Sequence, residues 1–106
     1  MKHTAIAQTL SAITKEMQLI GLWHDVSPST EKLASKLPFC VDTLTFCEWL
    51  QWVMFPKLFV IIETKAQLPL KSNMAVMAQE ALKREQADTE QLLKLIYQLD
   101  KDIVSN

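Results

Sequence analysis

The side chains that could carry out covalent or metal chemistry are few and scattered along the chain. Its only imidazoles belong to His3, near the N-terminus, and His24, in a predicted turn beside Asp25. Neither histidine has a second ligand at the i, i+4 spacing that places two metal ligands on one face of a helix. The sequence therefore predicts no metal site.

The two cysteines, Cys40 and Cys47, form no Cys-x-x-Cys pair and follow no apolar leader segment. We therefore expect free thiols and a cytoplasmic protein. Cys47 falls early in a predicted helix, where the helix N-terminus can lower the pKa of a thiol. Because a reactive thiol also needs exposure and a neighbouring base, we interpret Cys47 as a small buried apolar residue.

Asp42 is the acidic residue most open to a catalytic interpretation. A short acidic side chain just before a helix more often accepts hydrogen bonds from the first backbone N–H groups, and we interpret Asp42 as such a cap. The chain has no glycine-rich phosphate loop, no Gly-x-Ser-x-Gly nucleophile elbow and no paired-histidine motif. We therefore predict no catalytic residues, no cofactor and no enzymatic activity.

The elements that would position any site are predicted to be helices. The chain has 106 residues, 49% hydrophobic and 22% charged, which is typical of one globular domain over residues 1–106. It has a single glycine and no Asn-Gly or Asp-Gly pair, which disfavours tight hairpins. A net charge of −1 supplies no overall field for nucleic acid or anionic lipid. Because of this low net charge, we do not favour direct nucleic-acid binding. No apolar run reaches the roughly 18 residues of a membrane span, so we expect no membrane insertion.

Helical periodicity predicts an all-α bundle of four principal helices plus a short extra helix. The first helix covers about residues 3–22 and ends at Gly21. A short helix of about two turns follows Ser27 and Pro28. Ser72 offers a cap for the helix that follows the central segment, and that helix breaks near Gln86. Capping-box residues at 88–91 begin the last helix. The apolar stripes outside the central segment are Ile6, Leu10, Ile13, Met17 and Ile20; Met74, Met77, Ala78, Ala81 and Leu82; and Leu92, Ile96, Leu99 and Ile103.

The segment from Phe46 to Ile62 is too apolar for a surface helix and is predicted to form the core of the bundle. Asp42 or Thr45 would cap it, Thr45 with Glu48 in capping-box spacing. At about 100° per residue, one side carries Trp49, Leu50, Val53, Met54, Val60 and Ile61. The other side carries Trp52, Phe55, Phe59 and Ile62 among Glu48, Gln51 and Glu63. Pro56 removes one backbone N–H, so the segment either bends there or divides into two abutting helices.

Two blocks of this region resemble a known family. They are Pro38-Phe39-Cys40-Val41-Asp42-Thr43-Leu44 and Glu48-Trp49-Leu50-Gln51-Trp52-Val53 with Pro56, and Leu68-Pro69 extends the likeness. They are similar to the signature of the YqcC-like family of small bacterial proteins, and the likeness covers nearly the whole chain. The resemblance implies a small cytoplasmic helical bundle with no catalytic residues to carry over. It also implies an association by name with tRNA pseudouridine synthase C, as a partner or pathway and not as the synthase.

The side of the central helix that carries Trp52 is the candidate functional surface. Its residues Glu48, Gln51, Trp52, Phe55, Phe59 and Glu63 have the apolar centre and polar rim expected of a protein-binding hot spot. The alternative is that the segment containing Leu33, Leu37 and Phe39 covers this side. We favour internal burial, because a small domain needs most of its apolar surface for stability.

Three functional hypotheses follow, of which a noncatalytic interaction module or adaptor leads. A tRNA pseudouridine synthase or another protein would be its partner. The second hypothesis is RNA binding through Lys71, Lys83, Arg84 and Lys94, which requires these cations to converge. The third is a carrier of a small apolar ligand, with Met17, Met54, Met74 and Met77 around an interior cavity. Solvated helix faces and close packing are the simpler explanations of both patterns.

Overall fold

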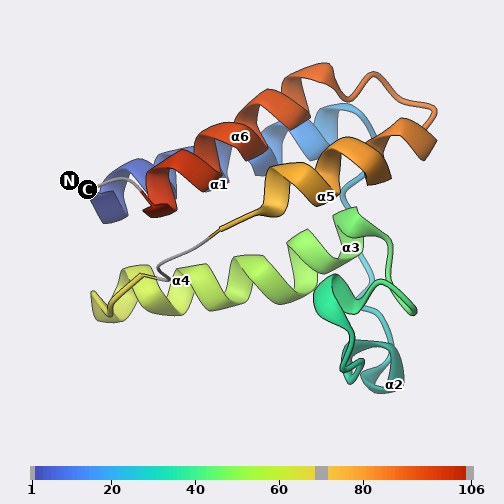
Figure 1. Cartoon of the computed structure of the whole chain (residues 1–106), viewed down its shortest axis with the longest axis horizontal. Helices are drawn as coiled ribbons and strands as arrows, with labels where there is room; N and C mark the ends of the chain where they lie inside the picture. The colour runs from blue at the N-terminus through green and yellow to red at the C-terminus, as the bar shows by residue number, and fades with distance from the viewer. Residues whose placement is uncertain (1, 69–71, 105–106) are drawn as a thin grey trace.

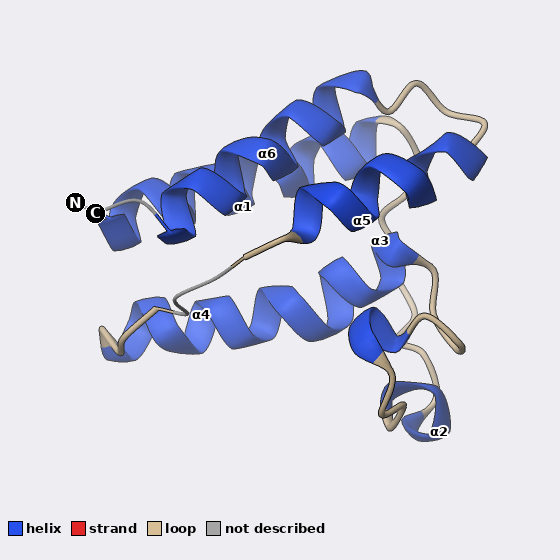
Figure 2. Ribbon diagram, viewed as in Figure 1, coloured by secondary structure: helices blue, strands red, loops and turns tan. Residues whose placement is uncertain are grey.

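The structure, a computed structural model, describes residues 2–68 and 72–104, and within these ranges helices and loops make up the fold (Figure 1, Figure 2). The longer helices are α1 (Lys2–Leu19), a central helix ending in α4 (Phe55–Thr64), α5 (Met74–Ala81) and α6 (Glu90–Val104). The short one is α2 (Thr30–Leu33). The predicted all-α bundle of four principal helices and one short helix is confirmed.

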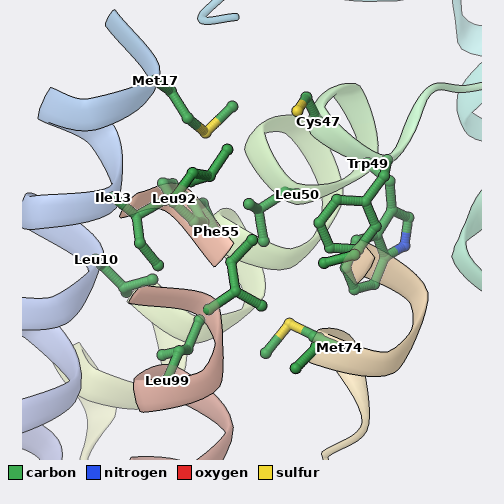
Figure 3. Packing of buried hydrophobic residues seen from close by; sticks show 14 of the residues in the cluster. Leu10, Ile13, Met17, Cys47, Trp49, Leu50, Phe55, Met74, Leu92 and Leu99 are labelled. Atoms are coloured by element: carbon green, nitrogen blue, oxygen red, sulfur yellow. The ribbon is translucent and has the colours of Figure 1, made fainter. Parts of the chain in front are cut away.

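The helices form two layers around one core. In Figure 1, α1 and α6 lie side by side and antiparallel, α5 packs beside α6, and the central helix runs along the opposite side of the bundle. The buried stripes of α1 and α6 are the predicted ones except for Ile20, which follows the end of α1 and is only partly buried. Figure 3 shows several of their side chains meeting Leu50 and Phe55 of the central helix. The side chains with no exposed surface in these stripes are Ile6, Leu10, Ile13, Met17, Leu92, Ile96 and Leu99.

The end of α1 follows the predicted glycine signal. Gly21 has φ +79°, a left-handed conformation that side chains disfavour. The backbone N–H of Leu22 donates to the carbonyl of Met17 at 2.8 Å, and that of Gly21 donates to Gln18 at 3.3 Å. These two hydrogen bonds form a Schellman motif, which satisfies carbonyls that the last helical turn leaves open.

The predictions for the start of α2 and for Asp42 are wrong in detail. Ser29, and not Ser27, accepts the backbone N–H of Lys32, and α2 is a single turn. Asp42 accepts a hydrogen bond from the hydroxyl of Ser35 and does not cap the central helix. The Asp42 carboxylate, which the sequence suggested as a cap, is therefore bound within its own loop by Ser35.

Thr45 provides the cap of the central helix, which begins with α3 (Phe46–Trp49). Its hydroxyl accepts the backbone N–H of Glu48 at 3.1 Å, and the Glu48 carboxylate accepts the N–H of Thr45 at 2.9 Å. This reciprocal pair is the predicted capping box, and it commits the Glu48 side chain to the helix start.

The central helix continues past Pro56 as one element. Between α3 and α4 it contains a π-helical turn, η2 (Leu50–Met54), in which the N–H of Phe55 donates to Leu50, five residues earlier. The proline ring would clash with the carbonyl four residues before it, and a wider turn relieves that clash. The alternative of two abutting helices is therefore wrong.

The wider turn also changes which residues face the core. One extra residue in a turn rotates later residues by about 100° relative to a uniform α-helix. Phe55 and Leu58 are 2% and 1% exposed, whereas Val60 is 58% exposed. The predicted grouping of Val60 with Trp49 and Leu50 on one side of the helix is therefore wrong, because it assumed the same pitch throughout.

The segment before the central helix packs against Trp49. The 3₁₀ turn η1 (Pro38–Cys40) contains two residues with positive φ, Phe39 at 58° and Cys40 at 49°. Each such residue costs on the order of 1 kcal/mol. The turn places the ring of Phe39 edge-on to Trp49, with centroids 4.6 Å apart. Phe39 belongs to the segment that was the alternative cover for the Trp52 side, and it packs against Trp49 instead.

A carboxylate from another helix caps α5. Asp100 of α6 accepts the backbone N–H groups of Met74 at 3.1 Å and Ala75 at 2.8 Å. Ser72 was predicted as the cap, but its hydroxyl donates to Asp100. After α5 the 3₁₀ turn η3 (Leu82–Arg84) leads to the predicted break near Gln86. Within the part of the chain that the structure describes, no helix combines the length and apolarity that crossing a membrane would require.

Candidate functional site

A solvent-open groove runs along the side of the central helix that carries Trp52, and we call it the Trp52 groove. It has a volume of about 370 Å³. One wall comes from the loop after α1 and the other from the π-helical turn and the start of α4. Its lining residues are Trp23, His24, Asp25, Gln51, Trp52, Phe55, Pro56 and Phe59.

Gln51 fixes the two walls relative to each other. Its side-chain oxygen accepts the backbone N–H of His24 at 2.9 Å, and its amide Nε2 donates to the carbonyl of His24 at 2.7 Å. The side chain is 6% exposed, and both of its polar ends are satisfied. Gln51 was predicted on the rim of a binding patch, but it is a buried support that holds the His24 backbone against the helix.

Aromatic rings form the base and sides of the groove. Phe55, at the base, is 2% exposed and packs at 6.1 Å between centroids against both Trp23 and Phe59. The Phe59 ring meets Phe55 edge-to-face, at 75° between planes, and is itself 50% exposed. Phe55 therefore belongs to the core, whereas Phe59 offers about half of its surface to solvent.

Trp52 combines partial exposure with an unsatisfied donor. Its side chain is half-buried, but its indole Nε1 is buried and has no hydrogen-bond partner within the described residues. A buried donor without an acceptor costs about 1–3 kcal/mol. Phenylalanine would fill much of the same space without that cost, so the fold alone does not account for tryptophan at this position.

The predicted site is therefore only partly a surface. Trp52 and Phe59 line an open groove, Gln51 and Phe55 support it from inside, Glu48 is used in the capping box, and Glu63 is exposed on the last turn of α4. The interpretation that this side is completely buried is wrong for Phe59. The prediction that it binds a partner stays a prediction.

Three lining residues escaped the sequence reasoning. Trp23, His24 and Asp25 follow the first helix, and nothing local indicates which later residue they would meet. The available signal was the short polar Trp-His-Asp loop directly after a glycine-terminated helix. Their position depends on the Gln51 hydrogen bonds, which join residues 27 positions apart in the chain.

The side chains considered for covalent chemistry occupy structural positions. Cys47 is 2% exposed, and burial, reinforced by the charges of Glu85 and Glu48, raises the pKa of its thiol from 9.0 to about 12. Such a thiol remains protonated at neutral pH and is a poor nucleophile, so the buried interpretation of Cys47 is confirmed. His3 contacts the carbonyl of Ala66 through Nε2 at 3.0 Å. Among the described residues, no three histidine, cysteine or acidic side chains cluster in a way that could hold a metal ion.

Two of the four cations of the RNA hypothesis are paired with carboxylates. Lys83 lies 3.3 Å from a carboxylate oxygen of Glu80, and Lys94 lies 3.7 Å from one of Glu90. Arg84 lines a different groove, and Lys71 lies outside the described residues. Pairing with a neighbour on the same helix is what solvated helix faces show.

The methionines of the carrier hypothesis do not surround one space. Met17 and Met74 are packed in the core, as Figure 3 shows, and are 0% and 2% exposed. Met54 and Met77 line separate surface grooves on either side of Phe39. This arrangement is that of gap-filling side chains in a close-packed bundle.

The fold and the groove together define a small helical bundle with an open aromatic groove on its central helix. Over residues 5–102 the chain matches the DUF446 family, whose description is tRNA pseudouridine synthase C, and it belongs to that family. The predicted resemblance to YqcC-like proteins is thereby confirmed.

Relatives of similar length support this assignment. The chain is 34% identical over 94 residues to an uncharacterised protein of Haemophilus influenzae, covering 89% of this chain and 88% of that one. It is 30% identical over 93 residues to the uncharacterised protein YqcC of Escherichia coli, covering 88% and 83%. The solution NMR structure of E. coli YqcC superposes with a TM-score of 0.84 at 25% identity, covering 98% of this chain and 89% of that one.

A further relative is much longer. The chain is 31% identical over 68 residues to tRNA pseudouridine synthase C of Pectobacterium carotovorum. This match covers 64% of the present chain but only 18% of the longer protein. A segment similar to about two thirds of this chain is thus part of a longer polypeptide.

Proposed function

We propose that this protein is a noncatalytic interaction module that binds a tRNA pseudouridine synthase through the Trp52 groove. The observation that carries the proposal is the Pectobacterium relative, in which a segment similar to 64% of this chain occupies 18% of a chain named tRNA pseudouridine synthase C. Two parts joined in one polypeptide in one organism are candidates for a noncovalent complex where they are separate chains.

The chemistry of the described side chains supports a noncatalytic role. The Cys47 thiol is buried and protonated at neutral pH, and Asp42 is paired with Ser35. A general base must lie within hydrogen-bond reach of the group it activates. Neither of these side chains offers an exposed reactive atom with a base at that distance.

The composition of the groove supports a role in protein binding. Aromatic side chains that are partly exposed and flanked by polar groups are enriched at the energetic centres of interfaces. Phe59 and Trp52 meet this description, and Gln51 holds the opposite wall in place. A groove that is already formed loses less conformational entropy on binding than a flexible one.

The test is a binding measurement between purified proteins. The chain is titrated by calorimetry into the tRNA pseudouridine synthase C of the organism that encodes it. We compare Phe59→Ser with Val60→Ser, a matched control because Val60 is the adjacent residue, is 58% exposed and does not line the groove. Phe59→Ser is expected to weaken binding by at least about tenfold, as removal of a hot-spot residue does, and Val60→Ser to leave it nearly unchanged.

Two results would contradict the proposal. One is the absence of binding by the unmodified chain at concentrations of tens of micromolar. The other is equal weakening by both substitutions, which would place the interface elsewhere on the central helix. The noncatalytic part has its own readout, because the purified chain alone is expected to form no pseudouridine in a tRNA substrate.

A further inference from the structure

The lining of the Trp52 groove includes one carboxylate and no lysine or arginine, and its other titratable side chain is His24. Among its eight lining residues, Asp25 is the only Asp, Glu, Lys or Arg, and it is exposed at the end of the loop wall. Lys57, the basic residue closest in sequence to the helix wall, does not line the groove. A cation entering the groove would therefore meet the Asp25 carboxylate, and no lysine or arginine lines the groove.

The rings of the groove favour the same kind of ligand. The faces of tryptophan and phenylalanine rings attract cations, and the attraction strengthens when the cation is partly desolvated. The ring centroid of Phe55 lies 6.1 Å from that of Trp23 and 6.1 Å from that of Phe59, and Trp52 completes the aromatic lining. A planar cation can stack on such rings while its edge remains free for hydrogen bonds.

We infer that the Trp52 groove binds an arginine side chain of the partner protein, with the guanidinium stacked on the aromatic lining and hydrogen-bonded to Asp25. The inference rests on the proposed function in taking the groove as the partner-binding surface. Arginine fits better than lysine because its five N–H donors lie in one plane. A stacked guanidinium can therefore donate hydrogen bonds from its edge to the Asp25 carboxylate, whereas an ammonium group has no planar face to stack.

The experiment follows the indole N–H signals of the ¹⁵N-labelled protein during titration. The probe is N-acetyl-arginine N-methylamide, and the matched control is its citrulline analogue, which has nearly the same shape and no charge. We expect saturable shifts of the Trp23 and Trp52 signals with the arginine probe. The Trp49 signal should stay nearly constant, because that side chain is 8% exposed and does not line the groove. Citrulline should bind on the order of tenfold more weakly, which corresponds to about 1.4 kcal/mol.

Two carboxylate variants provide the second comparison. Asp25→Asn should weaken arginine binding severalfold, and Glu63→Gln, an exposed acid on α4 outside the groove lining, should not. Equal binding of arginine and citrulline would overturn the inference. So would equal weakening by the two variants, or shifts confined to other parts of the protein.

Phe59→Ser and Asp25→Asn together separate this inference from the proposed function. If the synthase binds and Phe59→Ser abolishes binding, while Asp25→Asn has no effect, the groove is the interface but arginine is not its ligand. If the arginine probe binds as described and the synthase does not, the ligand preference stands and the choice of partner is wrong.

Discussion

Trp49 and Trp52 lie one turn apart on the same helix, and their side chains have different surroundings. Trp49 is 8% exposed and packs against two other rings, with centroids 4.6 Å from Phe39 and 5.7 Å from Phe46. Trp52 borders an open groove and carries a buried N–H with no partner. The difference indicates that one side of the central helix holds the bundle together, whereas the other tolerates an imperfect fit that a ligand could improve.

The largest expected effect concerns the Trp49 side. Trp49→Ala should lower the free energy of unfolding by about 3–5 kcal/mol, because it removes a buried indole and leaves a cavity between Phe39 and Phe46. Urea unfolding followed by circular dichroism measures the change. Trp52→Ala is the comparison and should cost less, since its side chain is already partly exposed. Equal costs would remove the distinction between the two sides.

A change in pH tests the buried side independently. Because the pKa of Cys47 is about 12 in the folded protein and its ordinary value is 9.0, the unfolded chain loses the thiol proton first. The contribution of the protonated Cys47 thiol to the free energy of unfolding is therefore fully present below about pH 9 and is lost as the pH rises toward 12. Between about pH 8 and about pH 10.5, the unmodified chain should lose about 2 kcal/mol more than Cys47→Ala.

The measurement is urea unfolding of both proteins at each pH under reducing conditions. Taking the change in unfolding free energy with pH within each protein cancels the cavity that the substitution leaves. Comparing the two changes then cancels the titration of lysines, which both proteins share. Parallel pH dependence of the two proteins would show that Cys47 is more accessible to solvent than its 2% exposure implies.

The smallest expected effect concerns Trp52 itself. Trp52→Phe should change the free energy of unfolding by less than about 1 kcal/mol, because loss of ring area is offset by removal of a buried donor that has no acceptor. Thermal unfolding of Trp52→Phe and Trp49→Phe side by side provides the measurement. A loss of several kcal/mol in Trp52→Phe alone would show that its indole N–H is satisfied in the folded protein.

Much of the fold follows from short-range signals. The glycine end of α1 and the capping box of Thr45 and Glu48 act within one helical turn, and both occur where predicted. The apolar stripes of α1 and α6 depend only on helical periodicity, and apart from Ile20 they are buried as expected. For these elements, neighbouring residues already contain the physical cause.

The candidate site was less predictable, because its geometry depends on distant partners. Trp52 and Phe59 could be chosen from the sequence, but the burial of Gln51 depends on the His24 backbone. The π-helical turn then shifted the register of the residues after it, so that Phe55 became part of the core and Val60 became exposed. A uniform helical pitch could not have predicted either result.

By itself, the sequence determined that the chain is helical, where most helices begin and end, and that the central helix is apolar on both sides. Only the tertiary structure decided which side is covered, where Phe39 packs and that Asp100 caps α5 across 25 residues. The physical reason is range. Periodicity, caps and glycine act within a few residues, whereas burial and long-range hydrogen bonds depend on which segments meet in space.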